Sequence, residues 1–360
     1  MMRVGEIIQA VETIAPFTTA LDWDNSGLLV GDKNAQVERV LIALDVTSQV
    51  VQEAKRKGAN LIISHHPVIF GSGRKKLVPG DPAVDALIAG ISVISAHTNW
   101  DMAQLGVNKA LADALGLKNQ QPLALEKSRC FQKLIAYVPA THADVVFNAM
   151  CEAGGGILGD YSAVGSLTDV EGRFTPKKGA DPYIGEVGQP CRVVEKAVEM
   201  LVHPDRMQDV LLAMKKAHPY EEPAYDIYEN KAVTDDCWLG VVGSLPASMG
   251  EIDFARLLGE KLGLAPRFNP GSRNIRRVAV CGGSGADYLK HAKGVDAFVT
   301  GDVKHHQFIE AASRNITLYD AGHYATEQVS MPQLCKLLQQ RLAGVTVELS
   351  AAYSGQVVSV

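Results

Sequence analysis

The chain has 360 residues, of which 47% are hydrophobic and 21% charged, proportions that fit a globular protein with sizeable cores. Its formal net charge of -5 provides no overall basic field, which makes nucleic acid and membrane surfaces unfavourable partners. No apolar run approaches the ~18–20 residues that span a bilayer, and the N-terminus lacks the features of a signal peptide. The six cysteines lie far apart with no Cys-x-x-Cys pair, as is typical of free thiols in a reducing compartment. We therefore expect a cytoplasmic protein with two or three domains.

Apolar strands alternate with helices over residues 1–126, the pattern of βαβ units and a largely parallel sheet. Strands are predicted at 39–44, 61–64 and 91–96, and helices at 3–15, 46–57, 82–89 and 107–115. Residues 236–360 repeat this order. Their predicted strands lie at 274–281, 297–300 and 316–319, and their predicted helices at 286–293, 308–313 and 331–342.

The two regions also share a short motif, because His97-x-x-x-Asp101 parallels His323-x-x-x-Glu327. Chance similarity between two βα stretches is the alternative, and the repeated histidine and acid make it the weaker one. We therefore predict two duplicated α/β lobes, 1–126 and 236–360, which face each other across a cleft that holds the site.

The residues between the lobes, 127–235, follow another pattern. Strands are predicted at 133–138, 161–167, 192–201 and 224–228, and helices at 143–153 and 205–217, with a polar loop over 168–190. The order β-α-β-β-α-β is that of a split βαβ, or ferredoxin-like, fold. We therefore expect an independent α+β module inserted between the lobes.

The chemistry centres on the buried strand at 61–64, which ends in His65, His66 and Pro67. Ligands of α/β folds bind at the carboxyl ends of parallel strands. Adjacent side chains diverge in an extended backbone, so the two histidines suit two neighbouring ions better than one. A pair of surface histidines is the alternative explanation.

Three further residues join this pair as predicted metal ligands: Asp101, His323 and Glu327. His323 and Glu327 share one face of a helical turn, and the two oxygens of Glu327 could bridge two ions. Imidazole and carboxylate together suit zinc or iron, with manganese also open. Two such ions ~3.5–4 Å apart would activate a water and clamp a phosphate or carbonyl oxygen. A helix cap at Asp101 and a surface pair of His323 with Glu327 are the alternatives.

Other polar residues near strand ends have less certain roles. His97 is a candidate catalytic residue that supports the ligands or acts as an acid or base, although a structural histidine is commoner at such a position. Asp302 is a candidate for supporting a ligand or contacting substrate. His305 and His306 lie several residues beyond their strand, so we interpret them as non-ligands. The turn 282–285 could bind phosphate through its amides, but glycines required by backbone geometry are the commoner explanation.

Five motifs along both lobes resemble those of the NIF-three-like proteins, also called GTP cyclohydrolase I type 2 homologues. They are Trp23-Asp24-Asn25-Ser26-Gly27-Leu28, Ser64-His65-His66-Pro67, Ala96-His97-Thr98-Asn99-Trp100-Asp101, Thr300-Gly301-Asp302 and Gly322-His323-Tyr324-Ala325-Thr326-Glu327. The resemblance covers essentially the whole chain and implies a dinuclear site of divalent ions that shares Glu327. It places His66 and Asp101 on one ion, and His65 and His323 on the other. It also implies a toroidal homohexamer and an insert similar to the trimeric CutA/PII-like fold.

Two functions remain open at this point. One is a metal-dependent hydrolase that acts on a phosphorylated or nucleotide-like small molecule, as the name GTP cyclohydrolase 1 type 2 homolog suggests. The other is a non-enzymatic, metal-binding regulatory or chaperone-like hexamer. The sequence contains no Walker A motif to hold a nucleoside triphosphate, and it does not identify the small-molecule ligand.

Overall fold

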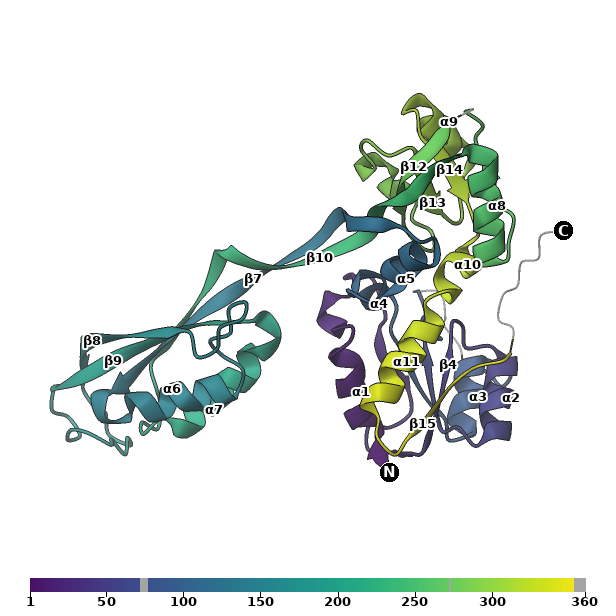
Figure 1. The fold of residues 1–360 in the computed structure, drawn as a ribbon. Coiled ribbons are helices and arrows are strands. Elements are labelled where there is room, and N and C mark those ends of the chain that lie inside the picture. Colours follow the sequence, from purple (N-terminus) through teal and green to yellow (C-terminus); the bar gives the residue numbers. More distant parts are fainter. Residues whose placement is uncertain (72–76, 272, 353–360) are drawn as a thin grey trace. The chain divides into compact units, whose positions relative to one another are not determined.

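The computed structural model describes residues 1–71, 77–271 and 273–352 of a mixed α/β protein (Figure 1). The chain divides into two compact units, one of Met1–Lys127 with Cys237–Val360 and the other of Ser128–Asp236. Within the described ranges, no helix has the length and apolar character needed to cross a membrane.

The first sheet of the larger unit has the strand order β15-β4-β5-β6-β2. Its strands are β2 (Gly27–Val30), β4 (Arg39–Ala43), β5 (Leu61–Ser64), β6 (Ser92–Ser95) and β15 (Thr346–Leu349), and a separate pair joins β1 (Met2–Arg3) to β3 (Gln36–Val37). Neighbouring strands from β15 to β6 are parallel, whereas β2 is antiparallel to β6. The predicted strand at 61–64 is confirmed residue for residue.

The helices α1 (Val4–Glu12), α2 (Ser48–Lys57), α3 (Pro82–Ile88), α4 (Thr98–Met102) and α11 (Met331–Arg341) and the 3₁₀ turn η1 (Phe17–Thr19) pack around this sheet. Helix α5 (Val107–Ala114) packs mainly against the second sheet, and α10 (His323–Gln328) contacts α5. Helix α2 begins and ends at residues that cap it. The Thr47 side chain accepts a hydrogen bond from the Val50 amide, and Gly58 ends the helix with a φ of 68°, as predicted.

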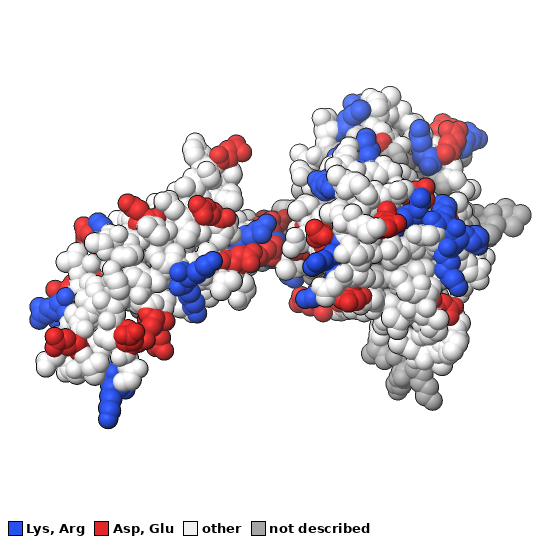
Figure 2. All heavy atoms as spheres, turned by 90° about the horizontal axis from the view of Figure 1, so that it is seen from below, with Lys and Arg blue, Asp and Glu red and all other residues white. Residues whose placement is uncertain are grey.

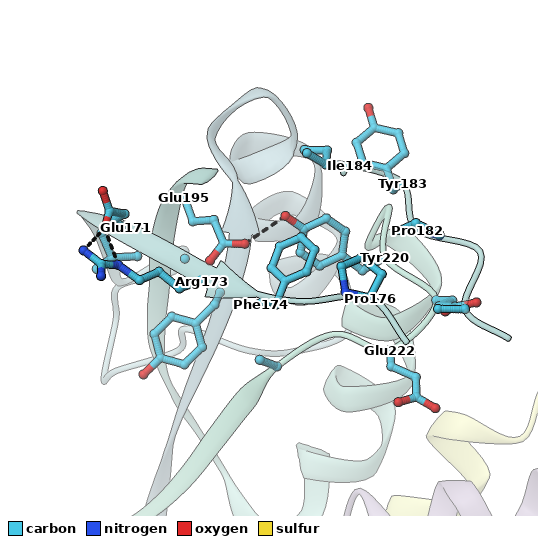
Figure 3. Close-up of a pocket in the computed structure, with 16 residues that line it drawn as sticks. Glu171, Arg173, Phe174, Pro176, Pro182, Tyr183, Ile184, Glu195, Tyr220 and Glu222 are labelled. Atoms are coloured by element: carbon cyan, nitrogen blue, oxygen red, sulfur yellow. Dashed lines mark hydrogen bonds and ion pairs between the residues drawn. The ribbon is translucent and has the colours of Figure 1, made fainter. Parts of the chain in front are cut away.

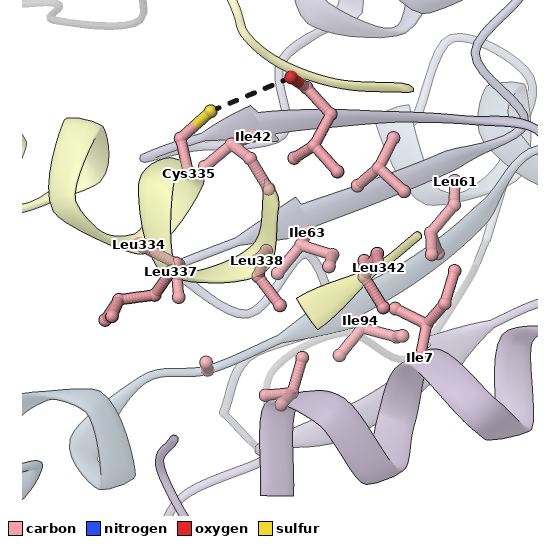
Figure 4. Packing of buried hydrophobic residues seen from close by; sticks show 14 of the residues in the cluster. Ile7, Ile42, Leu61, Ile63, Ile94, Leu334, Cys335, Leu337, Leu338 and Leu342 are labelled. Carbon is pink, nitrogen blue, oxygen red and sulfur yellow. Dashed lines mark hydrogen bonds between the residues drawn. The ribbon is translucent and has the colours of Figure 1, made fainter. Parts of the chain in front are cut away.

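The C-terminal residues of the chain complete the core of this first sheet. Leu334 and Leu338 of α11 pack against Ile63 of the sheet, with Ile7 of α1 nearby (Figure 4). Strand β15 extends the same sheet beside β4 (Figure 1). It was not predicted from the sequence, because only Val347 of its four residues is buried. The segment 331–349, counted above with the lobe 236–360, therefore packs with the N-terminal lobe.

The second sheet of this unit follows the order β11-β14-β13-β12-β10-β7. Its elements are β7 (Lys118–Pro139), β10 (Tyr225–Gly250), α8 (Glu251–Leu262), β11 (Arg267–Phe268), β12 (Asn274–Val280), η4 (Ala286–His291), β13 (Ala297–Thr300), α9 (His305–Ser313) and β14 (Thr317–Asp320). The helix predicted at 286–293 is a short 3₁₀ helix, bounded by Gly285 and by the turn at Gly294. Helix α8 was not predicted.

The two sheets place their ligand motifs at matching points. Each contains three consecutive parallel strands, β4-β5-β6 and β12-β13-β14. In each, the third strand leads into a short helix that carries a motif residue, α4 with Asp101 and α10 with Glu327. The two His-x-x-x-acid motifs thus occupy equivalent positions in the two sheets.

The smaller unit has the order of a split βαβ fold. Its sheet runs β10-β7-β9-β8 and its elements include η2 (Ala140–His142), α6 (Ala143–Glu152), β8 (Gly165–Phe174), β9 (Cys191–Val202), η3 (Pro204–Arg206) and α7 (Met207–Ala217). Helices α6 and α7 lie side by side on one face of the sheet (Figure 1). Their buried side chains share one apolar core with it. The strand predicted at 161–167 is wrong in extent, because β8 is an exposed edge strand whose polar residues resemble a loop. Strands β7 and β10 are also longer than predicted, because polar residues interrupt the apolar pattern of both.

Candidate metal centre

His65 and His66 follow β5 and point to different partners. His65 is 0% exposed, and its ring Nδ1 donates to the carbonyl of Ala96 at 3.0 Å. The Nδ1 of His66 donates instead to Asp45 Oδ1 at 2.7 Å. Each contact occupies one ring nitrogen and leaves Nε2 for the centre of the cluster, which is how metal-binding histidines are commonly oriented.

The remaining predicted ligands come from α4 and α10. Asp101 lies on α4, and His323 and Glu327 lie one turn apart on α10, with His323 Nε2 3.1 Å from Glu327 Oε1. Asp302 holds His323 through a 2.6 Å hydrogen bond from Nδ1. The structure thus places Asp302 in the supporting role considered from the sequence.

The five predicted ligands meet in two groups that share Glu327. One contains His65, Asp101 and Glu327, the other His66, His323 and Glu327, and the ligand atoms within each group lie within 4.8 Å of one another. Their pairing differs from that implied by the family resemblance. His65 points toward Asp101, with 3.6 Å between Nε2 and Oδ1, whereas the Nε2 atoms of His66 and His323 are 3.3 Å apart.

Three buried atoms of the cluster lack hydrogen-bond partners among the described residues. They are Nε2 of His65, Oδ1 of Asp101 and Oε2 of Glu327. A buried polar atom without a partner costs about 1–3 kcal/mol, so native proteins rarely leave one unless it serves a ligand. Since imidazole nitrogen and carboxylate oxygen are donors for zinc, iron and manganese, the residues present fit a divalent metal.

The electrostatics of the cluster also fit the binding of a cation. Burial lowers the pKa of His66, but hydrogen bonds with Asp45 and Glu327 outweigh it and raise the pKa to about 10. His323, similarly placed between Glu327 and Asp302, has its pKa raised to about 9 against the effect of burial. Burial raises the pKa of Asp101 to about 7, whereas His65 and His323 hold the pKa of Glu327 well below its usual range despite burial. The carboxylates thus favour protonated histidines, and the binding of a metal ion would displace those protons.

His97 stands beside the ligand groups. Its ring centroid lies 5.2 Å from that of His65 and 5.7 Å from that of His66, and the three histidines form a further group able to hold a metal. Its Nδ1 donates to the buried Asp24 at 2.7 Å. Neither Asp24 nor Asp45 was assigned a role from the sequence. Asp45 lies two residues beyond the end of β4, so the convergence of parallel strand ends was a usable signal.

Two buried contacts fix α4 and α10 relative to each other. The indole of Trp100 donates to the Ser330 hydroxyl at 3.1 Å, and that hydroxyl donates to the Glu327 carbonyl at 2.7 Å. Gly283 allows Glu327 into the centre, because a Cβ at this position would lie 2.0 Å from Glu327 Oε1. Packing thus positions Asp101 and Glu327 relative to each other.

The turn at 282–285 has its amides occupied by side chains. Those of Gly282, Gly283 and Gly285 donate to Asn108, Thr326 and Thr300 respectively. The explanation by backbone geometry is therefore favoured over phosphate binding. His305 and His306 are exposed in the first turn of α9 and belong to none of the potential metal-binding groups of the described chain.

A cavity of about 510 Å³ opens onto the cluster. Trp23 and Phe70 line it, with exposed fractions of 62% and 50%, and their ring centroids lie 6.0 Å apart. Both rings also approach His97, at centroid distances of 6.1 and 5.7 Å. The centre is thus accessible and bordered by aromatic surface.

Comparison with known proteins agrees with this architecture. The family model Duf34/NIF3 (NGG1p interacting factor 3) matches residues 2–355. A Halalkalibacterium halodurans protein named GTP cyclohydrolase 1 type 2 homolog is 37% identical over 97% of this chain and 96% of its own, and a Bacillus subtilis protein of the same name is 38% identical over 89% and 88%. The crystal structure of a Bacillus cereus protein related to NIF3 matches with a TM-score of 0.84 and 34% identity, over 100% of this chain and 99% of its own. The chain therefore belongs to the Duf34/NIF3 family.

Proposed function

We propose that this protein binds two divalent metal ions and is a metal-dependent hydrolase for a phosphorylated or nucleotide-like small molecule. One ion would take His65, Asp101 and Glu327, and the other His66, His323 and Glu327. The observation that carries the proposal is the meeting of these two groups around one shared carboxylate. The unpartnered buried atoms of His65 and Asp101 support it.

A pair of divalent ions would supply Lewis acidity to a phosphoryl or carbonyl oxygen and a water activated near neutral pH. The chain's own residues would hold the ions and orient the side chains that bind them. Asp45 and Asp302 fix the rings of His66 and His323, and Glu327 keeps its negative charge between the two groups. With Nδ1 held by Asp24, His97 has Nε2 left to exchange a proton with a bound substrate.

The substrate class follows from the border of the cavity. Exposed Trp23 and Phe70 provide aromatic faces, on which a planar base can stack at about 1–3 kcal/mol. The name shared by the two bacterial relatives also points to a nucleotide-like substrate. On the face shown in Figure 2, acidic and basic side chains are mixed on each unit, as suits a small ligand better than a nucleic acid.

A second candidate is a non-enzymatic metal-binding assembly. The inserted unit favours it, because its split βαβ order and its own cavity suit a ligand-sensing module similar to the CutA/PII-like fold. In this alternative the protein would form a homohexamer and the ions would be structural or cargo.

Activity measurements separate the two candidates. The purified protein, loaded in turn with zinc, iron(II) or manganese(II), would be assayed with GTP, other nucleotides and simple phosphoesters. We expect turnover with at least one combination of metal and substrate. Glu327→Gln should lower the rate about 100-fold or more, a larger loss than the one caused by removing a residue that supports a ligand. His306→Ala, which changes an exposed histidine outside the cluster, is the matched control. Absence of turnover across the panel, or an unchanged Glu327→Gln, would favour the assembly.

A further inference from the structure

The inserted unit contains a cavity of about 410 Å³ that is independent of the metal centre. It lies between the end of β8, the loop that follows it and the segment after α7. This volume falls within the range of small-molecule sites, about 300–1,000 Å³. The residues that line it combine aromatic rings with a buried carboxylate (Figure 3).

The aromatic part consists of Phe174, Tyr183 and Tyr220. The ring centroids of Phe174 and Tyr220 are 5.9 Å apart, and those of Tyr183 and Tyr220 are 6.3 Å apart. Figure 3 shows Phe174 beside Tyr220, with Tyr183 on the neighbouring loop. Rings from three separate segments therefore border one space, and their faces attract cations.

The acidic part is Glu195 of β9, which is only 6% exposed. Tyr220 donates its hydroxyl hydrogen to Oε1 at 2.9 Å (Figure 3). Burial and the nearby Glu195 raise the pKa of Tyr220, so this hydroxyl stays a donor. The Oε2 atom lies against Gly172, where an added Cβ would approach it to 2.2 Å. A buried carboxylate is costly unless its charge is matched, and one tyrosine hydroxyl does not match it.

The other charged groups at the cavity add negative charge. Glu171 pairs with Arg173, so these two offset each other (Figure 3). Glu221 and Glu222 leave two further carboxylates in the lining. Glu195, Glu221 and Glu222 thus give the cavity an excess of negative charge, which repels phosphates and nucleotides.

We propose that this cavity binds a small organic cation, an alkylated ammonium or protonated amine attached to an apolar group. The cation would lie against the faces of Phe174, Tyr183 and Tyr220, and its charge would face Glu195. Both features recur where proteins recognise ammonium ligands, namely aromatic rings and a nearby anion. The site lies wholly within the inserted unit and does not depend on the metal chemistry proposed above.

Calorimetric titration of the full-length protein with benzyltrimethylammonium tests this inference. Neopentylbenzene, its neutral carbon analogue, and phenyl phosphate, an anion with the same ring, are the comparison probes. We expect the cation to bind at least tenfold more tightly than the neutral analogue, and phenyl phosphate to show no competition with it.

The variants assign the binding to this cavity. Glu195→Gln should weaken binding of the cation at least tenfold, and Phe174→Leu should weaken the cation more than the neutral analogue. Glu199→Gln removes a charge from the same strand outside the cavity and should leave affinity unchanged. Phe174→Leu also keeps the test valid if Glu195→Gln fails to fold. Equal binding of the neutral probe, preference for phenyl phosphate, no binding, or cation binding that survives both variants would overturn the proposal.

Discussion

At the residue scale, the proposed metal centre depends on oxygens that accept a hydrogen bond from Nδ1 of each histidine. His65, His66, His97 and His323 each direct Nδ1 to an oxygen, of Ala96, Asp45, Asp24 and Asp302 respectively. Such contacts select the tautomer whose Nε2 can bind a metal. The carbonyl and the three carboxylates are therefore as much a part of the site as the ligands.

Asp24 offers the clearest test of this supporting layer. It accepts hydrogen bonds from the ring of His97 and from the amide and hydroxyl of Thr98, at 2.7, 3.0 and 2.6 Å. Against the effect of burial, these contacts hold its pKa well below the usual range, so its contribution is present at neutral pH and lost only in strong acid. We expect Asp24→Asn to lower the free energy of unfolding by about 1–3 kcal/mol in urea denaturation at pH 7. The exposed Asp22→Asn is the control, and equal stability of the two variants would contradict this role.

The residues of the cluster could be predicted from the sequence, but their grouping could not. His65, His66, Asp101, His323 and Glu327 stood out because they end strands or share a helical face. Their grouping depends on which way each side chain leaves the backbone, and here His65 turns to Asp101 and His66 to His323. Asp24 lies more than seventy residues from His97 in the chain, and no local pattern joins such a pair.

At the scale of elements, strands and helices with a strong apolar pattern were predicted closely. The strands β5 and β13 agree with their predicted bounds, whereas β8 is polar and largely exposed, and β7 and β10 carry polar residues over much of their length. An exposed strand is stabilised by its neighbours in the sheet and carries little apolar signal of its own.

His218 joins three elements of the inserted unit and makes its stability dependent on pH. It follows α7, and Nε2 donates to the Tyr137 carbonyl of β7 while Nδ1 accepts from the Tyr220 amide. Burial lowers its pKa from 6.5, so below that value the unfolded chain takes up more protons than the folded one. Stability contributed by neutral His218 is therefore complete at higher pH and is lost as the pH falls below 6.5.

Hydrogen exchange at pH 7 and pH 5.5 tests this dependence. The comparison is made between variants at each pH, so that the intrinsic exchange rate cancels. We expect peptides of α7 and the following turn to lose protection at the lower pH in the wild type, and to lose less in His218→Gln. His142 also lowers the pKa of His218 through its charge, so His142→Gln should lose an amount of protection between those of the wild type and His218→Gln. An identical loss in His218→Gln would exclude His218 as the cause.

At the scale of the whole molecule, the insert leaves and re-enters the larger unit at neighbouring points. The Ser128 hydroxyl donates to Asp236 Oδ1 at 2.6 Å, so the two ends of the insert are adjacent. All residues of the proposed metal centre lie outside 128–236.

Replacement of residues 128–236 by an Asn-Gly turn should therefore give a folded protein. This dipeptide favours the tight turn that joins two antiparallel strands. We expect the shortened chain to unfold cooperatively and to bind the same number of metal ions per chain as the full-length protein. A shortened chain that aggregates or loses metal would show that the larger unit depends on the insert.

Metal analysis of the protein tests directly whether the cluster binds two ions. Apoprotein would be loaded with excess zinc, iron(II) or manganese(II), freed of unbound metal by gel filtration and measured by mass spectrometry of the elements. We predict two ions per chain for the wild type and for the His306→Ala control. Asp101→Ala and His323→Ala each remove a ligand from a single group, so each variant should bind about one ion. Fewer than two ions in the fully loaded wild type, or two ions retained in both ligand variants, would contradict a dinuclear centre built on Glu327.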